Sequence, residues 1–118
     1  MDAGLVQEIE LLNQRVCKGL GDPKRVMILY ALAERPQYVS ELAAELNTPQ
    51  PTISRHLKIL RDCALVTAQR ESNTVYYAVA DPRIIQALDL MRAMLHDRVM
   101  ENARLINANG AASTTQGE

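Results

Sequence analysis

Apolar residues in the first part of the chain recur at intervals of three and four positions. This is the spacing of a helix that buries one face, because side chains three and four positions apart lie on the same side of an α-helix. The pattern predicts a first helix over Leu5–Leu20. Its apolar stripe consists of Leu5, Val6, Ile9, Leu12, Val16 and Leu20.

A second helix is predicted from Pro23 to about Glu34. Glycines at positions 19 and 21 interrupt the first pattern, and the pair Asp22-Pro23 is a strong start signal. Aspartate accepts hydrogen bonds from free backbone amides, and proline fits the first helical turn. The expected buried residues are Val26, Leu29 and Leu32, and Pro36 stops the helix.

Two further helical segments follow, separated by a turn. Ser40 is a suitable cap for a short helix over Glu41–Leu46. Prolines at positions 49 and 51 would disrupt a helix interior but not a first turn, whose amides have no intrahelical partner. We therefore expect the next helix to start at Pro49, with Thr48 as its cap. A short helix, a tight turn and a second helix form a helix-turn-helix.

The helix over Gln50–Arg61 is the expected DNA-reading element. Its apolar residues Ile53, Leu57 and Leu60 form one stripe, and the other face is polar. Amides and guanidinium groups read base edges, while cations and hydroxyls bind phosphates. The alternative is an ordinary surface helix with a solvated face. The candidate DNA-binding residues are Gln50, Thr52, Ser54, Arg55, His56, Lys58 and Arg61; His56 either contacts DNA or hydrogen-bonds internally.

A predicted β-hairpin after this helix favours the DNA-binding interpretation. Leu65–Gln69 and Val75–Val79 are rich in β-favouring residues, and a polar turn over Arg70–Thr74 joins them. A hairpin beside a helix-turn-helix is a wing. Arg70, Asn73 and Thr74 at its tip either reach the DNA backbone or form an ordinary polar loop.

The last predicted helix starts after Asp81-Pro82 and runs to about Ile106. Its apolar stripe and that of the first helix exceed what the winged unit can bury, so we expect two copies to pack through their first and last helices. The fold is expected to be mainly α-helical with a small β-hairpin wing. Residues 1–106 form one DNA-binding and dimerisation domain, and residues 107–118, rich in small polar residues, form a disordered tail.

Charge is distributed unevenly along the chain. The formal net charge is −1, yet residues 47–80 carry four basic and two acidic side chains and are the one stretch with a positive balance. A dimer presents this stretch twice. The basic residues are Arg55, Lys58, Arg61 and Arg70, and the acidic ones are Asp62 and Glu71. No window has the length of a membrane span and the start lacks the pattern of a secretory signal, so a cytoplasmic protein is expected.

Four segments, in this order, make the chain resemble the ArsR/SmtB family of winged-helix repressors over roughly residues 12–106. They are Leu20-Gly21-Asp22-Pro23-Lys24-Arg25, Ser40-Glu41-Leu42-Ala43, the run from Gln50 to Lys58, and Val75-Tyr76-Tyr77. The resemblance implies a cytoplasmic homodimer that binds an imperfect palindrome in double-stranded DNA. It also implies release by an inducer, often a metal ion.

The metal sites typical of that family are not present in this sequence. One needs a Cys-x-Cys in the third helix, where this chain has Glu41-Leu42-Ala43-Ala44-Glu45-Leu46. The other needs Asp-x-His and a second pair further along the last helix, where this chain has Asp81-Pro82-Arg83 and then Met94 to Asp97, with His96 in another register. Neither familiar metal site is therefore expected, and the sequence indicates no cofactor with certainty.

Two cysteines could respond to a thiol-reactive species or a thiophilic ligand. Cys17 is either such a sensor or a packed apolar residue, since free cysteine is often buried. Cys63 follows the predicted reading helix, before Ala64, at a position where the family favours glycine. Nearby Arg61 favours its thiolate and Asp62 opposes it, so Cys63 is either a reactive thiol or a half-buried cap.

The sequence thus predicts a DNA-binding transcriptional regulator, most simply a repressor that an inducer releases from its operator. A repressor without ligand control and a winged-helix module that binds a protein remain alternatives; steep salt dependence would distinguish DNA from a mainly apolar protein partner. An enzyme is not expected, because no catalytic set of side chains has workable spacing. The inducer, the operator and the regulated genes are not encoded in any recognisable pattern.

Overall fold

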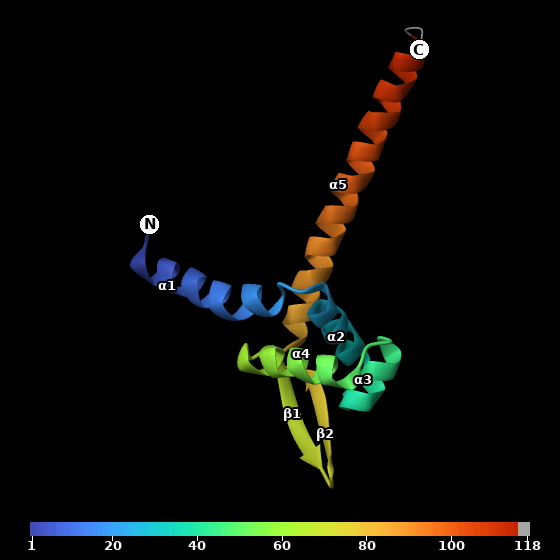
Figure 1. Ribbon diagram of the computed structural model, residues 1–118. Helices are drawn as coiled ribbons and strands as arrows, with labels where there is room; N and C mark the ends of the chain where they lie inside the picture. The colour runs from blue at the N-terminus through green and yellow to red at the C-terminus, as the bar shows by residue number, and fades with distance from the viewer. Residues whose placement is uncertain (116–118) are drawn as a thin grey trace. The chain divides into compact units, whose positions relative to one another are not determined.

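The computed structural model describes the backbone of residues 1–115 and the side chains of residues 1–107. Five α-helices, one π-helix and a two-stranded sheet follow in the order shown in Figure 1: α1 (Ala3–Leu12), η1 (Asn13–Cys17), α2 (Pro23–Glu34), α3 (Val39–Glu45), α4 (Gln50–Asp62), β1 (Val66–Glu71), β2 (Thr74–Val79) and α5 (Pro82–Thr115). The chain divides into two units after Ile85. The predicted mainly α-helical fold with a hairpin wing is confirmed.

The first helix differs from the uninterrupted helix predicted over Leu5–Leu20. The α-helix ends at Leu12, and Asn13–Cys17 form a π-helix with a wider turn. None of the residues of α1 is buried.

The predicted start of α2 is confirmed. Asp22 is the N-cap, its carboxylate accepts a hydrogen bond from the Lys24 amide at 2.7 Å, and Pro23 takes the first helical position. The helix ends at Glu34, as expected. Leu29 and Leu32 are buried, whereas Val26 is half-buried and Ile28 takes its place in the core.

The prediction that Ser40 caps α3 is wrong. The helix begins at Val39, so Ser40 lies within its first turn and is exposed, and Tyr38 holds the N-cap position. The Glu41 carboxylate accepts the Tyr38 amide proton at 3.2 Å and also pairs with Arg35 at 2.9 Å. A glutamate at the third helical position thus satisfies the free amide that a serine cap would not have reached.

Helices α3 and α4 end in the same kind of turn. After α3, the amides of Asn47 and Thr48 donate to the carbonyls of Ala44 and Ala43, and Asn47 has a φ of 48°. After α4, the corresponding bonds run from Ala64 to Arg61 and from Leu65 to Leu60, and Ala64 has a φ of 61°. Both are Schellman turns, in which the left-handed residue is most often glycine.

Ala64→Gly is therefore expected to stabilise the protein. A left-handed alanine costs about 1–2 kcal/mol, part of which is offset because glycine loses more chain entropy on folding, so a net gain of about 0.5–1 kcal/mol is expected. Ala64 is exposed, so removing its Cβ leaves no cavity. Thermal unfolding should show a midpoint a few degrees higher. Asn47→Gly is the matched control. Its gain in stability should be smaller, because asparagine tolerates the left-handed backbone better than alanine does. Equal gains in stability at both positions would contradict the argument.

The wing is a hairpin with a shorter loop than predicted. Strands β1 and β2 pair antiparallel from Val66↔Val79 to Glu71↔Thr74, so the loop consists of Ser72 and Asn73 alone. Arg70 and Thr74 therefore lie in the strands and not in a five-residue turn. Ser72 has a φ of 56°, as primed two-residue hairpin turns require, and these turns match the twist of paired strands.

The base of the hairpin is joined to the segment between α2 and α3. Gln37 exchanges two backbone hydrogen bonds with Tyr77, at 3.0 and 2.8 Å. The Gln37 side chain is buried and its amide donates to the Ala31 carbonyl at 2.9 Å. Tyr38 and Tyr76 pack edge to face with ring centroids 5.5 Å apart. These contacts fix the direction in which the wing leaves the helices.

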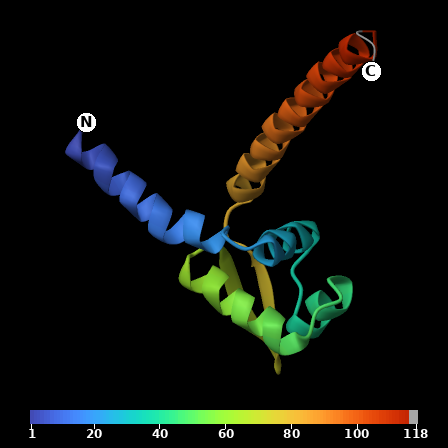
Figure 2. The same cartoon turned by 45° about the horizontal axis from the view of Figure 1, so that its top comes forward.

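The core of the winged unit is formed by aliphatic side chains of α2, α3, α4 and the start of β1. Figure 2 shows α3 and α4 joined by their short turn, with α2 beside them. The fully or nearly fully buried residues include Ile28, Leu29, Leu32, Leu42, Ile53, Leu57, Leu60, Leu65 and Val66. This arrangement leaves the outer face of α4 uncovered.

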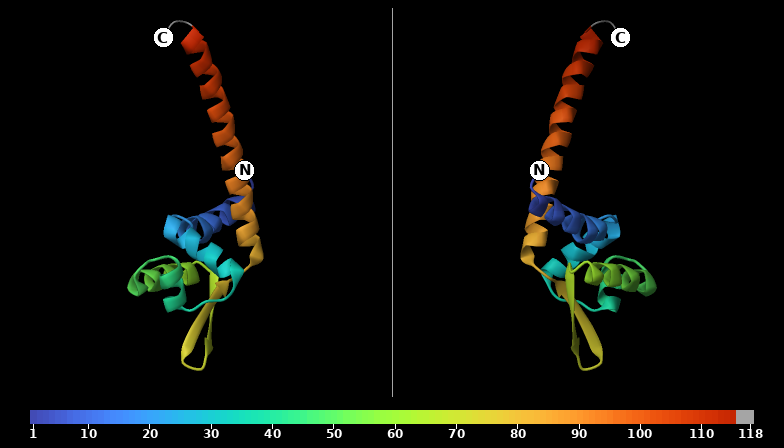
Figure 3. Two further views of the ribbon diagram at one scale, coloured as in Figure 1. Left: turned by 90° about the vertical axis from the view of Figure 1, so that its right-hand side faces the viewer. Right: turned by 90° about the vertical axis from the view of Figure 1, so that its left-hand side faces the viewer.

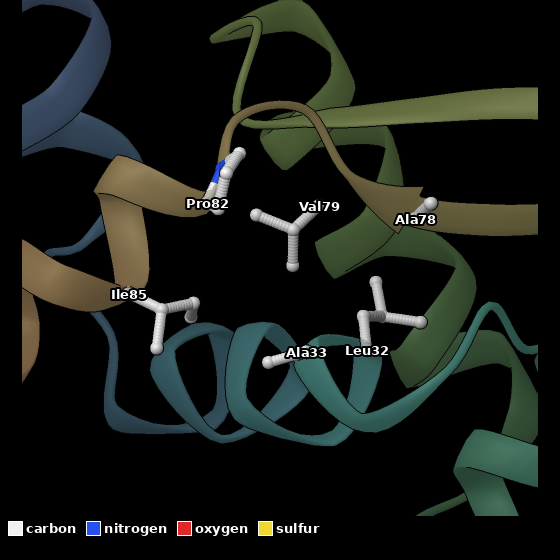
Figure 4. Close-up of a pocket in the computed structure, with 6 residues that line it drawn as sticks. All are labelled: Leu32, Ala33, Ala78, Val79, Pro82 and Ile85. Carbon is white, nitrogen blue, oxygen red and sulfur yellow. The ribbon is translucent and has the colours of Figure 1, made fainter.

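A cavity of about 350 Å³ lies between α2, β2 and the first turn of α5. Figure 4 shows the side chains around it, which are Leu32, Ala33, Ala78, Val79, Pro82 and Ile85. None of these six side chains can donate or accept a hydrogen bond. The cavity is therefore an apolar packing gap without groups that would orient a polar ligand.

Helix α5 continues beyond the predicted end near Ile106 and stays helical to Thr115. Many of its large apolar side chains between positions 90 and 106 are exposed, among them Met91, Leu95 and Val99. Residues 116–118 lie outside the described part of the chain. Residues 107–115, where the sequence predicted a disordered tail, are therefore helical, and for residues 116–118 the tail stays a prediction.

Candidate nucleic-acid interface

Helix α4 separates its side chains into two faces. Ile53, Leu57 and Leu60 are at most 1% exposed and fix the helix onto the core, which it contacts through α2, α3 and β1. The opposite face is exposed and polar, and carries Gln50, Ser54, Arg55, Lys58 and Arg61. The structure therefore brings most of the predicted DNA-binding side chains together on one free surface, which is called the α4 polar face below.

The start of α4 differs by one residue from the prediction. Pro49 is the N-cap and Gln50 the first helical residue, so Thr48 is not the cap. The Thr48 hydroxyl instead donates to the Leu46 carbonyl at 2.9 Å, within the turn after α3. Gln50 thus lies in the first turn, where free amides and the helix dipole favour negatively charged groups such as phosphates.

Arg55 and Thr52 interact on the α4 polar face. The Arg55 guanidinium donates to the Thr52 hydroxyl over a long distance of 3.4 Å. Arg55 is exposed, so its guanidinium is accessible to other acceptors. A contact of this length is weak and costs little to replace.

His56 lies at the edge of the α4 polar face and is less exposed than Arg55 and Lys58. It is half-buried, and its Nδ1 accepts a hydrogen bond from the Arg25 Nη1 of α2 at 3.3 Å. Partial burial lowers the pKa of His56, the cations Arg25, Arg55 and Lys24 lower it further, and Asp22 opposes them. His56 is therefore mainly neutral near pH 7. The sequence interpretation left internal hydrogen bonding open for His56, and the structure contains such a bond.

The wing carries the remaining predicted contacts. Arg70 and Asn73 are exposed and Thr74 is half-buried. Figure 3 shows the hairpin projecting away from α2, α3 and α4 as a two-stranded ribbon. Glu71 lies next to Arg70 and reduces the positive charge of the tip. A DNA contact by these three residues stays a prediction.

Comparisons with known proteins agree with this geometry. Residues 22–68 match the family model described as bacterial regulatory protein, arsR family. An HTH-type transcriptional regulator of Methanocaldococcus jannaschii is 40% identical over 77 residues, which are 64% of this chain and 86% of the relative. The regulator CmtR of Mycobacterium tuberculosis is 40% identical over 82 residues, 69% of this chain and 70% of CmtR. The chain belongs to the ArsR family.

A solved structure supports the fold independently. The winged helix-turn-helix domain Mb0332 of Mycobacterium bovis, described as homodimeric, superimposes with a TM-score of 0.74 over 86% of this chain and 93% of that one, at 24% identity. The superposition shows that this ArsR-family protein has a winged-helix fold, and its 40% identical relatives show that it is a DNA-binding transcriptional regulator. No helix among its described residues combines the length and apolar character needed to cross a membrane.

The two cysteines of this ArsR-family regulator lie in different environments. Both are free thiols, Cys17 exposed and Cys63 buried. Cys63 is the C-cap residue of α4, as one of its two interpretations expected, but it is buried and not half-buried. Cys17 ends the π-helix and does not belong to the core of the chain. A sensory role stays a prediction for both.

The family's metal positions have other partners here. The Asp81 carboxylate accepts hydrogen bonds from the Arg83 side chain, the shortest at 2.6 Å, and these bonds lower the pKa of Asp81 to about 2. Within the part of the chain that the structure describes, no three His, Cys, Asp or Glu side chains of one protomer cluster as metal ligands would. The expectation that no metal is bound stays a prediction.

Sequence reasoning missed Arg25 as part of this site. Its guanidinium contacts His56 across 31 positions of sequence, a separation that local patterns do not reveal. The one available signal was the segment Leu20-Gly21-Asp22-Pro23-Lys24-Arg25, which contributes to the family resemblance but suggested a helix start and no role for Arg25.

Proposed function

We propose that this ArsR-family regulator is a cytoplasmic repressor that binds an imperfect palindromic operator as a homodimer and leaves it when an inducer acts. The observation that carries the proposal is the α4 polar face, held outward by a completely buried apolar stripe. A protein that covers promoter DNA excludes the transcription machinery by occupancy alone, so repression needs no further domain.

Gln50, Thr52, Ser54 and Arg55 are assigned to base edges in the major groove. A side-chain amide pairs with adenine through two hydrogen bonds, and a guanidinium group pairs with guanine in the same way. Lys58, Arg61 and Arg70 are assigned to phosphates, which fix the position of the protein on the duplex. Asn73 and Thr74 approach the adjacent backbone through the wing.

Exposed apolar surface supports the homodimer. Leu5, Ile9 and Leu12 of α1 are each about half exposed, and Met91, Leu95 and Val99 of α5 are more so. A single chain rarely leaves two such stripes in water, and a two-fold dimer covers both at once. The two α4 helices would then read half-sites about one helical turn of DNA, roughly 34 Å, apart.

Cys17 is the better placed of the two cysteines for control by a thiol-reactive inducer, because its sulfur is exposed while Cys63 is buried. Repression without ligand control is the alternative. Comparing DNA binding by the reduced and the oxidised protein distinguishes them: loss on oxidation that thiol reverses supports a thiol inducer, and indifference to oxidation contradicts it.

A salt titration with Lys58→Ala tests the function. Wild-type binding to the upstream DNA of its own gene, followed by fluorescence anisotropy, should weaken steeply as salt rises, because each neutralised phosphate releases counterions. Removing Lys58 from both protomers should reduce the slope of log affinity against log salt by about two. Arg98→Ala on α5 removes the same charge outside the winged unit and should leave the slope unchanged.

Two results would contradict the proposal. Wild-type binding to the duplex that does not respond to salt would show that the protein neutralises no phosphates, and would leave the protein-binding module, whose interface is mainly apolar, as the favoured function. An equal change of slope in the Lys58 and Arg98 variants indicates that net charge, and not the α4 polar face, determines the affinity.

A further inference from the structure

One guanidinium group connects three helical segments of the winged unit. Arg25, on α2, donates from Nε to the Gly19 carbonyl at 2.8 Å and from Nη2 to the Lys18 carbonyl at 3.1 Å. Its Nη1 reaches His56 Nδ1 on α4 at 3.3 Å. The end of the N-terminal helical segment, α2 and the DNA-reading helix therefore share a single side chain.

The first two bonds hold the guanidinium in place. Gly19 is buried against the end of α4, and a Cβ at this position would overlap the Leu65 side chain. The absence of a side chain lets the backbone approach closely enough to present its carbonyl to Arg25. Because two of its edges are occupied by carbonyls, Arg25 has little freedom to turn away from His56.

The third bond determines the state of the His56 ring. A guanidinium has five N–H donors and no acceptor, so Nδ1 of His56 must accept. An accepting Nδ1 belongs to a neutral imidazole whose proton is on Nε2. The charged groups facing the ring agree with this state: Lys24 and Arg25 of α2 and Arg55 of α4 oppose a positive ring, and Asp22 alone favours it.

We propose that Arg25 is a positioning residue for DNA binding, which fixes His56 as an Nε2–H donor to a phosphate oxygen of the operator. This inference rests on the proposed function. Arg25 itself contacts no DNA; it acts by orienting a neighbour on α4, in the way that an outer hydrogen bond selects the tautomer of a catalytic or metal-binding histidine. The N-terminal segment takes part because its carbonyls hold the guanidinium.

The test combines operator affinity with the ¹⁵N chemical shifts of the His56 ring in the full-length protein. The chain has two histidines, so His56→Gln assigns the signals. Wild-type His56 should be neutral near pH 7 with its proton on Nε2. Arg25→Gln should populate the other tautomer and weaken operator binding about tenfold, the effect of one lost hydrogen bond to a charged group. Arg25→Lys, which keeps the charge but loses the fork, should also shift the tautomer.

Lys24→Gln is the matched control, since Lys24 acts on His56 through charge alone. Removing either cation should raise the pKa of His56, but only the Arg25 variants should change its tautomer. In the double variant Arg25→Gln/His56→Gln, operator binding should be no weaker than in His56→Gln, because both changes remove the same contact. A purely structural role of Arg25 predicts additive losses instead.

Three outcomes overturn the assignment: a wild-type ring with its proton on Nδ1, unchanged operator affinity in a folded Arg25→Gln protein, or additive losses in the double variant. Should Arg25→Gln fail to fold, Arg25→Lys carries the same comparison. Failure of the proposed function looks different, because the wild-type protein would then bind no operator while its histidine tautomer could still be measured.

Discussion

Replacing Leu57 by alanine is expected to lower the free energy of unfolding by about 2–5 kcal/mol, the cost of removing a buried leucine side chain and leaving a cavity. Leu57 is 1% exposed and lies in the middle of the stripe that fixes α4 to the core. Natural domains have a total stability of about 5–15 kcal/mol, so this one change removes a large part of it. Chemical denaturation followed by circular dichroism measures the loss.

Lys58→Ala provides the control for this experiment, because it truncates the neighbouring residue on the exposed face of the same helix. A change within about 0.5 kcal/mol is expected there. Both variants must be compared at one protein concentration, since the stability of a dimer depends on it. Equal stabilities of the Leu57 variant and the wild type would show that α4 is not held by its apolar stripe.

Arg55→Ala is expected to reduce affinity for the operator by about 1–3 kcal/mol per half-site, roughly 5- to 150-fold, and to relax sequence preference. Arg55 is exposed, and the one hydrogen bond described for it, to Thr52, is long enough to be exchanged for a base. Affinity for a random duplex should change little, because a base contact contributes mainly to the cognate sequence. Binding of the variant to operator and random duplexes at one salt concentration gives both numbers.

Arg61→Ala is the matched comparison for Arg55→Ala. It removes the same type of side chain from the same face of α4, but from a position assigned to phosphate. The affinities for the operator and for the random duplex should therefore fall by the same factor. If Arg55→Ala also lowers the affinity for both duplexes by the same factor, the base-reading role of Arg55 is wrong, although the protein would still be a DNA-binding regulator.

Local signals in the sequence predicted the elements that local chemistry determines. Asp22 and Pro23 define the start of α2, because a cap and a first-turn proline act within three residues of each other. The apolar stripe of α4 predicted correctly which face is buried, since its period is that of the helix. The caps expected at Ser40 and Thr48 were wrong because α3 begins one residue before Ser40, and the Thr48 hydroxyl donates to the Leu46 carbonyl within the preceding turn.

Contacts between distant segments could not be predicted in this way. The pairing of Gln37 with Tyr77 and of Arg25 with His56 depends on how α2, α4 and the hairpin pack together. The sequence left open whether His56 contacts DNA or hydrogen-bonds internally, and only the packing of α4 against α2 shows its bond to Arg25. The π-turn that ends at Cys17 was likewise not predicted by the spacing of apolar residues.

The attachment of the wing has a consequence for the range of duplexes the protein can accommodate. Two-stranded hairpins are marginally stable alone, and here the bonds from Gln37 and the packing of Tyr38 on Tyr76 support the base and leave the two-residue tip unsupported. These contacts fix the direction of the hairpin at its base and not at its tip. Under the proposed function, minor grooves that differ in width with sequence would then be followed by the tip alone, while α4 keeps its place in the major groove.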